Sequence, residues 1–211
     1  MISLFLDTCN LNVIIAILKD EEVIYSKITE NKNDLSEKLL PMIKDGIESV
    51  GCTVKDLKKI FVAIGPGSFT GIRIGVTVAK TLAWALKIDI ITISSLEVLA
   101  SISTDKKYIC PLIDARRGYV YTGMYSSKLT RLMKDRYVKL DDFVSKLKYN
   151  KEDILFVSYD SMLDECITPS FDIKKIIEKH FNDKSLNPHE VNPIYLKLTE
   201  AEEKLNDREN N

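Results

Sequence analysis

The stretch 63–75 constrains the fold of this 211-residue chain more than any other, because four of the chain's eight glycines fall in it. The short apolar run 60–64 is bounded by glycine and proline, which predicts a buried strand. A helical pattern follows over 70–86, with Ser68 or Thr70 as its N-cap. The sequence therefore predicts a strand, a tight glycine turn and a long helix in succession.

One possible role of this glycine turn is to bind an anion. A glycine turn that opens a helix presents free backbone N–H groups and the positive end of the helix dipole, which favour phosphate. Gly65, Gly67 and Ser68 are then possible nucleotide contacts. The run nevertheless lacks the Lys-Ser/Thr ending of a P-loop, and its spacing does not fit the G-x-G-x-x-G pattern.

The other possible role of the glycine region is close packing. Gly71, Gly75, Ala79 and Ala83 recur every four residues along the predicted helix. Residues at this spacing share one helix face, so the row leaves that face almost bare and lets another helix come close. Glycine inside a helix costs about 0.5–1 kcal/mol relative to alanine, and close packing, inside the chain or with a partner, would offset this cost.

Composition and charge exclude several classes of protein. The chain carries 30 basic and 31 acidic residues, so it has no basic excess with which to hold nucleic acid alone. It has no apolar run of about 18 residues, and its start lacks the basic region of a signal peptide. These observations predict a cytoplasmic protein with no membrane contact.

The cysteines and histidines predict neither a disulfide framework nor a metal site. None of the four cysteines belongs to a C-x-x-C pair. The two histidines, His180 and His189, are nine residues apart, which is not the spacing of two metal ligands on one helix.

The order of apolar and periodic segments predicts two related units. The first half reads β-β-β-α-β-α-β-α and the second half repeats this order less clearly, which indicates an α/β protein with mixed sheets and flanking helices. Polar residues near 101–107 suggest a boundary between a subdomain 1–103 and a smaller subdomain 104–211, which ends in a charged helix from Thr199. A β-β-β-α-β-α unit that occurs twice is the architecture of the actin-like (ribonuclease H-like) fold, in which nucleotide binds between the halves.

Several motifs together resemble the signature of the TsaB family of threonylcarbamoyladenosine (t6A) biosynthesis proteins. The longest is the run 65–75, which is followed by Ala79-Lys80-x-Leu82-Ala83. The shorter matching pieces are, in chain order, Asp7-Thr8, Ser36-Glu-x-Leu-Leu-Pro41, Ser94-Ser-Leu-Glu-x-Leu-Ala100, Ile113-Asp-Ala-Arg-Arg117 with Val120-Tyr121, and Pro193-Ile-Tyr-Leu-Lys197. The likeness covers most of 1–125 and the last of these pieces, whereas 126–185 match poorly and look shortened.

The resemblance implies a scaffold or activator subunit with an actin-like fold, a reduced second half and no catalytic site of its own. In this family's complex the paralogue TsaD binds metal and transfers threonylcarbamoyl to the adenosine at position 37 of tRNAs that read codons beginning with A. The ATPase TsaE drives turnover. ATP or ADP and metal are thus expected on the partner subunits, and tRNA is expected to meet this chain only through the complex. Isolated members form homodimers.

The resemblance also places the TsaD interface on the helices at about 34–50 and 70–86. The interface residues that it predicts are Leu39, Ile43, Gly71, Arg73, Gly75, Ala79 and Ala83. Arg73, in the first turn of its helix, is expected to pair with an acid because its charge opposes the helix dipole. The substitution Gly75→Leu is expected to abolish association with TsaD and leave the fold largely intact.

A stand-alone actin-like ATPase or sugar kinase, or a metallopeptidase, is the alternative function. Actin-like ATPases carry a glycine in the phosphate loop after the first strand, whereas residues 7–10 read Asp-Thr-Cys-Asn. At Asp7 an Asx-type turn competes with a ligand role, and after Ile113 an Asp-capped turn competes with a cleft-facing cation. The possible nucleotide or cleft contacts are Asp7, Thr8, Gly65, Gly67, Ser68, Asp114 and Arg116; no residue is predicted to be catalytic or to bind metal.

Overall fold

A computed structural model of the protein describes residues 1–160 and 162–197. The helix predicted from Thr199 lies outside the described residues. The elements of the first half are β1 (Ile2–Asp7), β2 (Asn12–Lys19), β3 (Glu22–Glu30), α1 (Leu35–Ser49), η1 (Val54–Asp56), β4 (Leu57–Ala63), α2 (Phe69–Leu86), β5 (Asp89–Ile93) and α3 (Ser95–Leu99). Those that follow are β6 (Tyr108–Asp114), β7 (Tyr119–Ser126), β8 (Arg131–Lys139), α4 (Leu140–Ser145), η2 (Lys151–Asp153), β9 (Ile154–Val157), α5 (Ile173–His180) and η3 (Pro188–Glu190).

The first sheet has the strand order β3-β2-β1-β4-β5. β1 pairs antiparallel with β2 and parallel with β4, and β4 pairs parallel with β5. The strands β1, β2 and β4 are almost continuously apolar and buried, as expected for central strands that are covered on both faces. The outer strand β3 instead alternates between exposed and half-buried residues, which is the pattern predicted for a strand at a sheet edge.

The second sheet repeats this topology on a smaller scale. Its strand order is β8-β7-β6-β9, with β6 antiparallel to β7 and parallel to β9, as β1 is to β2 and β4. The sheet has four strands where the first has five, and the helix α4 that follows its third strand has six residues against fifteen in α1. The prediction of duplicated β-β-β-α-β-α units with a reduced second half is therefore confirmed.

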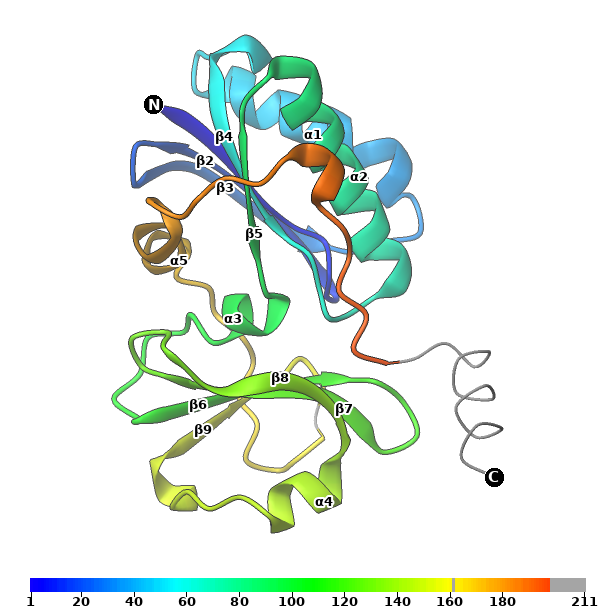
Figure 1. Ribbon diagram of the computed structural model, residues 1–211, viewed down its shortest axis with the longest axis vertical. Coiled ribbons are helices and arrows are strands. Elements are labelled where there is room, and N and C mark those ends of the chain that lie inside the picture. Colours follow the sequence, from blue (N-terminus) through cyan, green and yellow to red (C-terminus); the bar gives the residue numbers. More distant parts are fainter. Residues whose placement is uncertain (161, 198–211) are drawn as a thin grey trace.

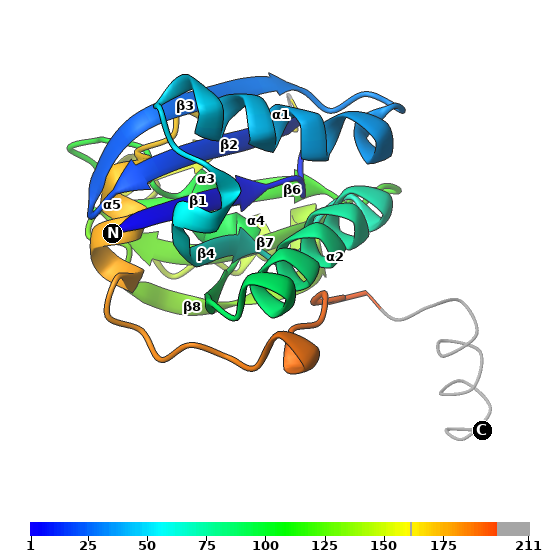
Figure 2. The same ribbon diagram turned by 90° about the horizontal axis from the view of Figure 1, so that it is seen from above.

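The two sheets lie one above the other, and helices pack around the first of them (Figure 1). α1 and α2 lie against one face of the first sheet, α5 lies on its other side, and the short helix α3 sits between the two sheets. Seen from above, α1 lies over β2 and β3, and α2 lies beside β4 (Figure 2). No helix in the described part of the chain is both long and apolar enough to span a lipid bilayer.

The segment after β9 returns to the first half. α5 packs against β3 and α3, and its buried face belongs to the core of the first sheet. Further on, Leu186 N donates to Ile90 O at 3.0 Å and Ile194 N donates to Ile64 O at 2.8 Å. The described chain from Ile173 to Ile194 belongs to the predicted subdomain 104–211, but in space it lies beside the first half (Figure 1).

Candidate functional site

The turn after β1 is packed tightly under the first turns of α2. Ser68 N donates to the carbonyl oxygen of Cys9 at 2.7 Å, and the Thr8 hydroxyl donates to Gly71 O at 2.7 Å. A Cβ atom on Gly71 would collide with the carbonyl oxygen of Thr8, and one on Gly75 would collide with its hydroxyl. Glycine stands in α2 because the helix backbone touches this turn directly.

The small-residue row of α2 is therefore an internal contact. Gly71, Gly75, Ala79 and Ala83 are all buried within the chain. The predicted interface residues Leu39 and Ile43 of α1 are buried as well, at 0% and 2% exposure. Five of these six residues face the interior of the chain, whereas Ile43, although buried, also lines the groove between α1 and α2 that is described below. The expectation that Gly75→Leu would spare the fold is wrong, because a side chain at position 75 would collide with Thr8.

Arg73 alone of the seven predicted interface residues lies at the surface. Its guanidinium carbon lies 3.7 Å from the centroid of the Phe69 ring, and its Nε donates to the hydroxyl of Tyr195 at 2.8 Å. The rings of Phe69 and Tyr195 are 5.0 Å apart. Among the ion pairs of the described residues Arg73 has none and lies instead against an aromatic face, so its predicted pairing with an acid, in this chain or on TsaD, stays a prediction.

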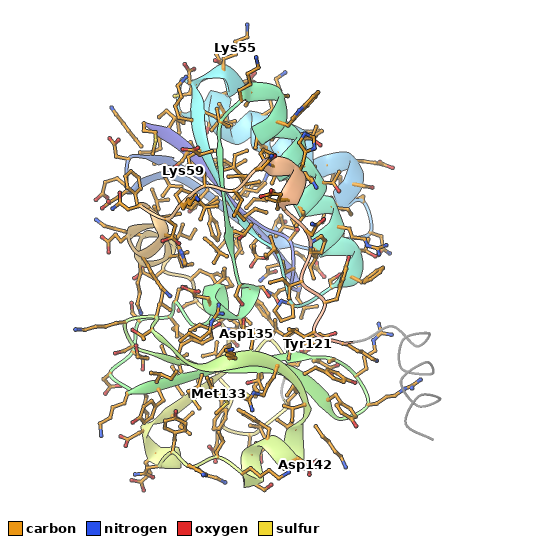
Figure 3. All side chains as sticks on the ribbon, in the orientation of Figure 1. Lys55, Lys59, Tyr121, Met133, Asp135 and Asp142 are labelled. Carbon is orange, nitrogen blue, oxygen red and sulfur yellow. The ribbon has the colours of Figure 1, made fainter. Side chains whose placement is uncertain are left out.

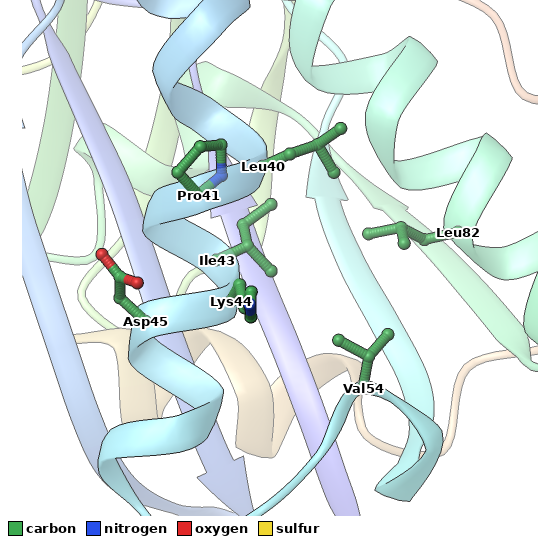
Figure 4. Close-up of a pocket in the computed structure, with 7 residues that line it drawn as sticks. All are labelled: Leu40, Pro41, Ile43, Lys44, Asp45, Val54 and Leu82. Carbon is green, nitrogen blue, oxygen red and sulfur yellow. The ribbon is translucent and has the colours of Figure 1, made fainter.

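An apolar groove of about 450 Å³ runs between α1 and α2 (Figure 4). Leu40 and Pro41 of α1 lie on one side, Leu82 of α2 on the other and Val54 of η1 below, with Lys44 at the edge. The Leu40 side chain is 51% exposed. The two helices of the predicted interface do form a surface; Ile43 is the predicted residue that lines it, and its other residues were not predicted.

A second hollow, of about 770 Å³, lies between the two halves and is called the cleft below. Four of the seven predicted cleft residues line it, namely Gly67, Ser68, Asp114 and Arg116. The other three are buried in the first half, namely Asp7, Thr8 and Gly65. Ser68 caps α2 as predicted, since its hydroxyl accepts from Gly71 N at 3.2 Å.

Asp7 forms the predicted Asx-type turn. One carboxyl oxygen accepts from Cys9 N at 2.7 Å, while the other has no hydrogen-bond partner among the described residues. The side chain is almost fully buried, and this burial raises the pKa of Asp7 to about 6 although the bond from Cys9 opposes the shift. The Asp7 carboxyl group is thus buried within the turn and does not line the cleft.

A cluster of charged side chains joins the two halves at α3 and is called the junction cluster here. Glu97 of α3 is 3% exposed and accepts from Lys179 Nζ at 2.6 Å and from His180 Nε2 at 2.8 Å. Arg131 of β8 lies 3.9 Å from the same carboxylate. Nearby, Asp135 of β8 accepts from the hydroxyl of Ser94, the N-cap of α3, at 2.5 Å. Figure 3 shows Asp135 on the side of β8 that faces the first half.

The junction cluster shifts the pKa values of its members. Burial alone would raise the pKa of Glu97, but the bonds from His180 and Lys179 lower it overall. Burial would likewise lower the pKa of His180, but bonds to Glu97 and Asp183 raise it. Sequence analysis missed this cluster because its members lie 82 and 83 residues apart along the chain. The one signal in the sequence is Glu97, an acid within the apolar segment that forms α3.

Two further observations concern metal ions and nucleotides. Over residues 1–160 and 162–197, no three His, Cys, Asp or Glu side chains gather in a way that could hold a metal ion. At the strand end where actin-like ATPases carry their phosphate loop, the backbone of Gly67 instead meets the carbonyl oxygen of Cys9, so a Cβ at position 67 would clash. The glycine turn is filled by the chain's own β1 turn.

Comparison with known proteins gives consistent matches over nearly the whole chain. The family described as TsaD, tRNA N6-adenosine threonylcarbamoyltransferase, matches residues 22–192. The tRNA threonylcarbamoyladenosine biosynthesis protein TsaB of Bacillus subtilis is 39% identical over 97% of this chain and 97% of its own length. TsaB of Buchnera aphidicola subsp. Schizaphis graminum is 35% identical over 74% of this chain and 77% of its own length.

Solved structures agree on the fold. The structure described as YeaZ from Pseudomonas aeruginosa matches with a TM-score of 0.82 at 20% identity, over 92% of this chain and 99% of that one. A second structure from the same organism, described as an uncharacterized protein with similarity to peptidase YeaZ, has a TM-score of 0.80 at 21% identity, over 93% and 99%. The predicted actin-like, ribonuclease H-like architecture is confirmed.

Proposed function

Because this chain belongs to the TsaB family of t6A biosynthesis proteins, we propose that it is the non-catalytic scaffold subunit of the complex that installs threonylcarbamoyl on tRNA. In this proposal the chain pairs with TsaD, and TsaE joins the pair. ATP or ADP and metal are bound by these partner subunits. The single observation that carries the proposal is the apolar groove between α1 and α2, which offers a contact surface on the two helices that the family resemblance assigns to pairing.

The chemistry of the groove supports a protein partner. Leu40 is 51% exposed and has Pro41, Leu82 and Val54 as apolar neighbours, while Lys44 and Asp45 lie at the rim. An apolar centre with charged residues around it is the usual anatomy of a protein interface. Burying a leucine of this exposure stabilises a complex by about 1–2 kcal/mol. A second copy of this chain presents the same surface, so a homodimer of the isolated chain is expected to use it too.

The turn after β1 supports a role without catalysis. In this turn the only acid, Asp7, is buried, and α2 covers the backbone that a phosphate would otherwise approach. A catalytic acid or base must reach its substrate within hydrogen-bond distance, which a side chain buried within the turn does not do.

Reconstitution tests this function. The chain mixed with TsaD, TsaE, ATP, tRNA and the threonylcarbamoyl adenylate is expected to give modified adenosine in tRNA, and the chain alone is expected to give none. Modified adenosine made by the chain alone would refute the scaffold role. Calorimetry with ATP and Mg²⁺ is the complementary measurement, since micromolar binding to the isolated chain would favour the alternative of a stand-alone ATPase or kinase.

The groove itself is tested by a pair of surface variants. Leu40→Asp places a charge at the centre of the groove and is expected to abolish co-elution with TsaD. Leu132→Asp is the matched control, because Leu132 has a similar exposure, 42%, but lies on β8 of the second sheet. If Leu40→Asp still co-elutes with TsaD while its circular dichroism and melting curve match the wild type, the interface lies elsewhere.

A further inference from the structure

Three tyrosines form a stacked surface on the second sheet, on the side that faces the cleft. Tyr121 of β7 pairs with Tyr137 of β8, and Tyr119 pairs with Lys139. Because paired residues and residues two apart share a sheet face, all four side chains lie on one side, which is called the tyrosine face here. The rings of Tyr119 and Tyr137 are stacked at 4.8 Å and 12°, and those of Tyr121 and Tyr137 are 5.7 Å apart.

The tyrosine face points toward the first half and is partly open to solvent. All three tyrosines are partly exposed, and Tyr121 lines the cleft. Figure 3 shows Tyr121 on the side of the sheet that faces the first half, opposite Met133, which points into the smaller core.

Cations surround the tyrosine face. Lys139 lies on the face itself, and Lys197 Nζ lies 5.7 Å from the centroid of the Tyr137 ring. Arg116 and Arg117 are exposed at the tip of the β6–β7 hairpin, where both have positive φ angles of 67° and 57°. Asp114, whose carboxylate accepts from Arg116 N at 2.8 Å, and Asp160 lie at the cleft wall, and Asp141 and Asp142 follow Leu140, whose N donates to Gly118 O at 2.9 Å.

The opposite wall of the cleft offers a second stacking group. Phe69, at the start of α2, is 50% exposed and lines the cleft, with the guanidinium of Arg73 against its ring. Aromatic side chains on both walls, each accompanied by a cation, suit a flat ligand that carries negative charge. Nucleic-acid bases stack on such rings, and each stacked base contributes about 1–3 kcal/mol.

We infer that the tyrosine face binds unpaired nucleotides of an RNA, with bases on the tyrosine rings and phosphates beside Arg116, Arg117, Lys139 and Lys197. The inference rests on the family's place in tRNA modification and not on the pairing with TsaD. Unpaired nucleotides are favoured over duplex because bases in a helix cannot reach a side-chain ring, whereas those of a loop can be splayed onto it. The overall charge of −1 limits the affinity of the isolated chain, so the contact adds to a larger RNA-binding surface in the complex.

The test measures binding of the isolated chain to a fluorescein-labelled single-stranded RNA of about 12 nucleotides by anisotropy at about 50 mM salt. Wild type is expected to bind, and Tyr137→Leu, which keeps bulk but removes the ring, is expected to bind about 5-fold or more weakly. The double variant Arg116→Gln/Arg117→Gln is expected to lower the slope of log K against log salt by about 1.

Tyr149→Leu is the matched control, since Tyr149 and Tyr108 form a tyrosine pair at 4.6 Å elsewhere in the second half. It is expected to bind RNA as the wild type does. No binding by wild type, or equal losses for Tyr137→Leu and Tyr149→Leu, would overturn the inference. Loss of TsaD co-elution by Tyr137→Leu with unchanged RNA binding would overturn it as well, because the face would then be a protein interface. Co-elution of the Leu40→Asp variant reports on the proposed pairing separately.

Discussion

The turns that follow the first strand of each half have the same local chemistry and different surroundings. Asp7 Oδ1 accepts from Cys9 N at 2.7 Å after β1, and Asp114 Oδ1 accepts from Arg116 N at 2.8 Å after β6. Thr8 and Cys9 of the first turn pack against the start of α2, and the residues after them reach the cleft, whereas the second turn ends in exposed arginines, of which Arg116 lines the cleft.

The difference between the two turns lies in what covers them. Behind β1 the fifteen-residue α1 and the eighteen-residue α2 pack on the sheet, and the glycines of α2 bring its backbone onto the turn. In the second half the helix after β8 has six residues, and α5 packs on the first sheet instead. One topology thus gives a closed structural turn where a long helix covers it and an open, charged turn where none does.

The largest expected effect compares one glycine from each turn. Gly71→Ala places a Cβ against the carbonyl oxygen of Thr8, a backbone atom, and is expected to destabilise the fold by about 3 kcal/mol. A Cβ at position 118 would have no atom within 4 Å, so Gly118→Ala is expected to lower the stability only through the strain of φ at +76°, by about 1 kcal/mol. Urea denaturation of both variants measures the difference. Equal losses would mean that the two turns are equally open.

The second prediction compares the two aspartates. Burial raises the pKa of Asp7 to about 6 from the 3.8 of an unfolded chain, so its favourable contribution is complete below about pH 4 and is lost as pH rises through 6. Asp7→Asn removes this penalty and is expected to be more stable than wild type at pH 8 by about 2 kcal/mol, with no gain near pH 4. Asp114→Asn, at an exposed turn, is expected to change stability by less than about 0.5 kcal/mol.

Thermal melts of both aspartate variants across pH 4–8 provide the measurement. If Asp7→Asn were less stable than wild type at pH 8, the Asp7 carboxylate would have to be ionised and stabilised in the fold. Full t6A synthesis by a complex that contains Asp7→Asn is also expected, since the proposed function gives this side chain no chemical step.

The smallest expected effect concerns the junction cluster, where the two halves meet. His180 has a raised pKa, so its contribution is complete below its ordinary value of 6.5 and is lost as pH rises through the folded pKa. Glu97 has a lowered pKa, so its contribution is present above its ordinary value of 4.5 and is lost as pH falls through the folded pKa. The cluster is therefore most stabilising between about pH 4.5 and 6.5.

His180→Gln tests this window. The free energy of unfolding of the variant is expected to be lower than that of the wild type by about 1 kcal/mol at pH 6. At pH 8 the two are expected to be almost equal, because Lys179 and Arg131 still face Glu97. Hydrogen exchange of α5 at the two pH values measures the effect locally. His189→Gln is the control, because His189 lies at the surface in η3, on the outer side of α2. A loss that is equal at pH 6 and pH 8 would show that the charge of His180 makes no difference.

Much of the architecture followed from local patterns. Apolar runs predicted the buried strands, the spacing after Thr70 predicted α2, and Ser68 and Ser94 cap helices as their types suggest. The row of small residues on α2 was predicted, but the turn after β1 that packs against it was not. Periodicity shows that a helix face is bare without showing which segment lies against it. Most residues of the α1–α2 groove were missed for the same reason.

By itself, the sequence determined the order of strands and helices, the glycine turn and the family, since these depend on residues that are neighbours along the chain. Tertiary structure alone decided that Gly71 and Gly75 serve the fold, that Glu97 meets His180, and that Tyr119 stacks on Tyr137. Those contacts join residues far apart in sequence. Their energies depend on burial and distance, and both are fixed only when the sheets and helices have packed together.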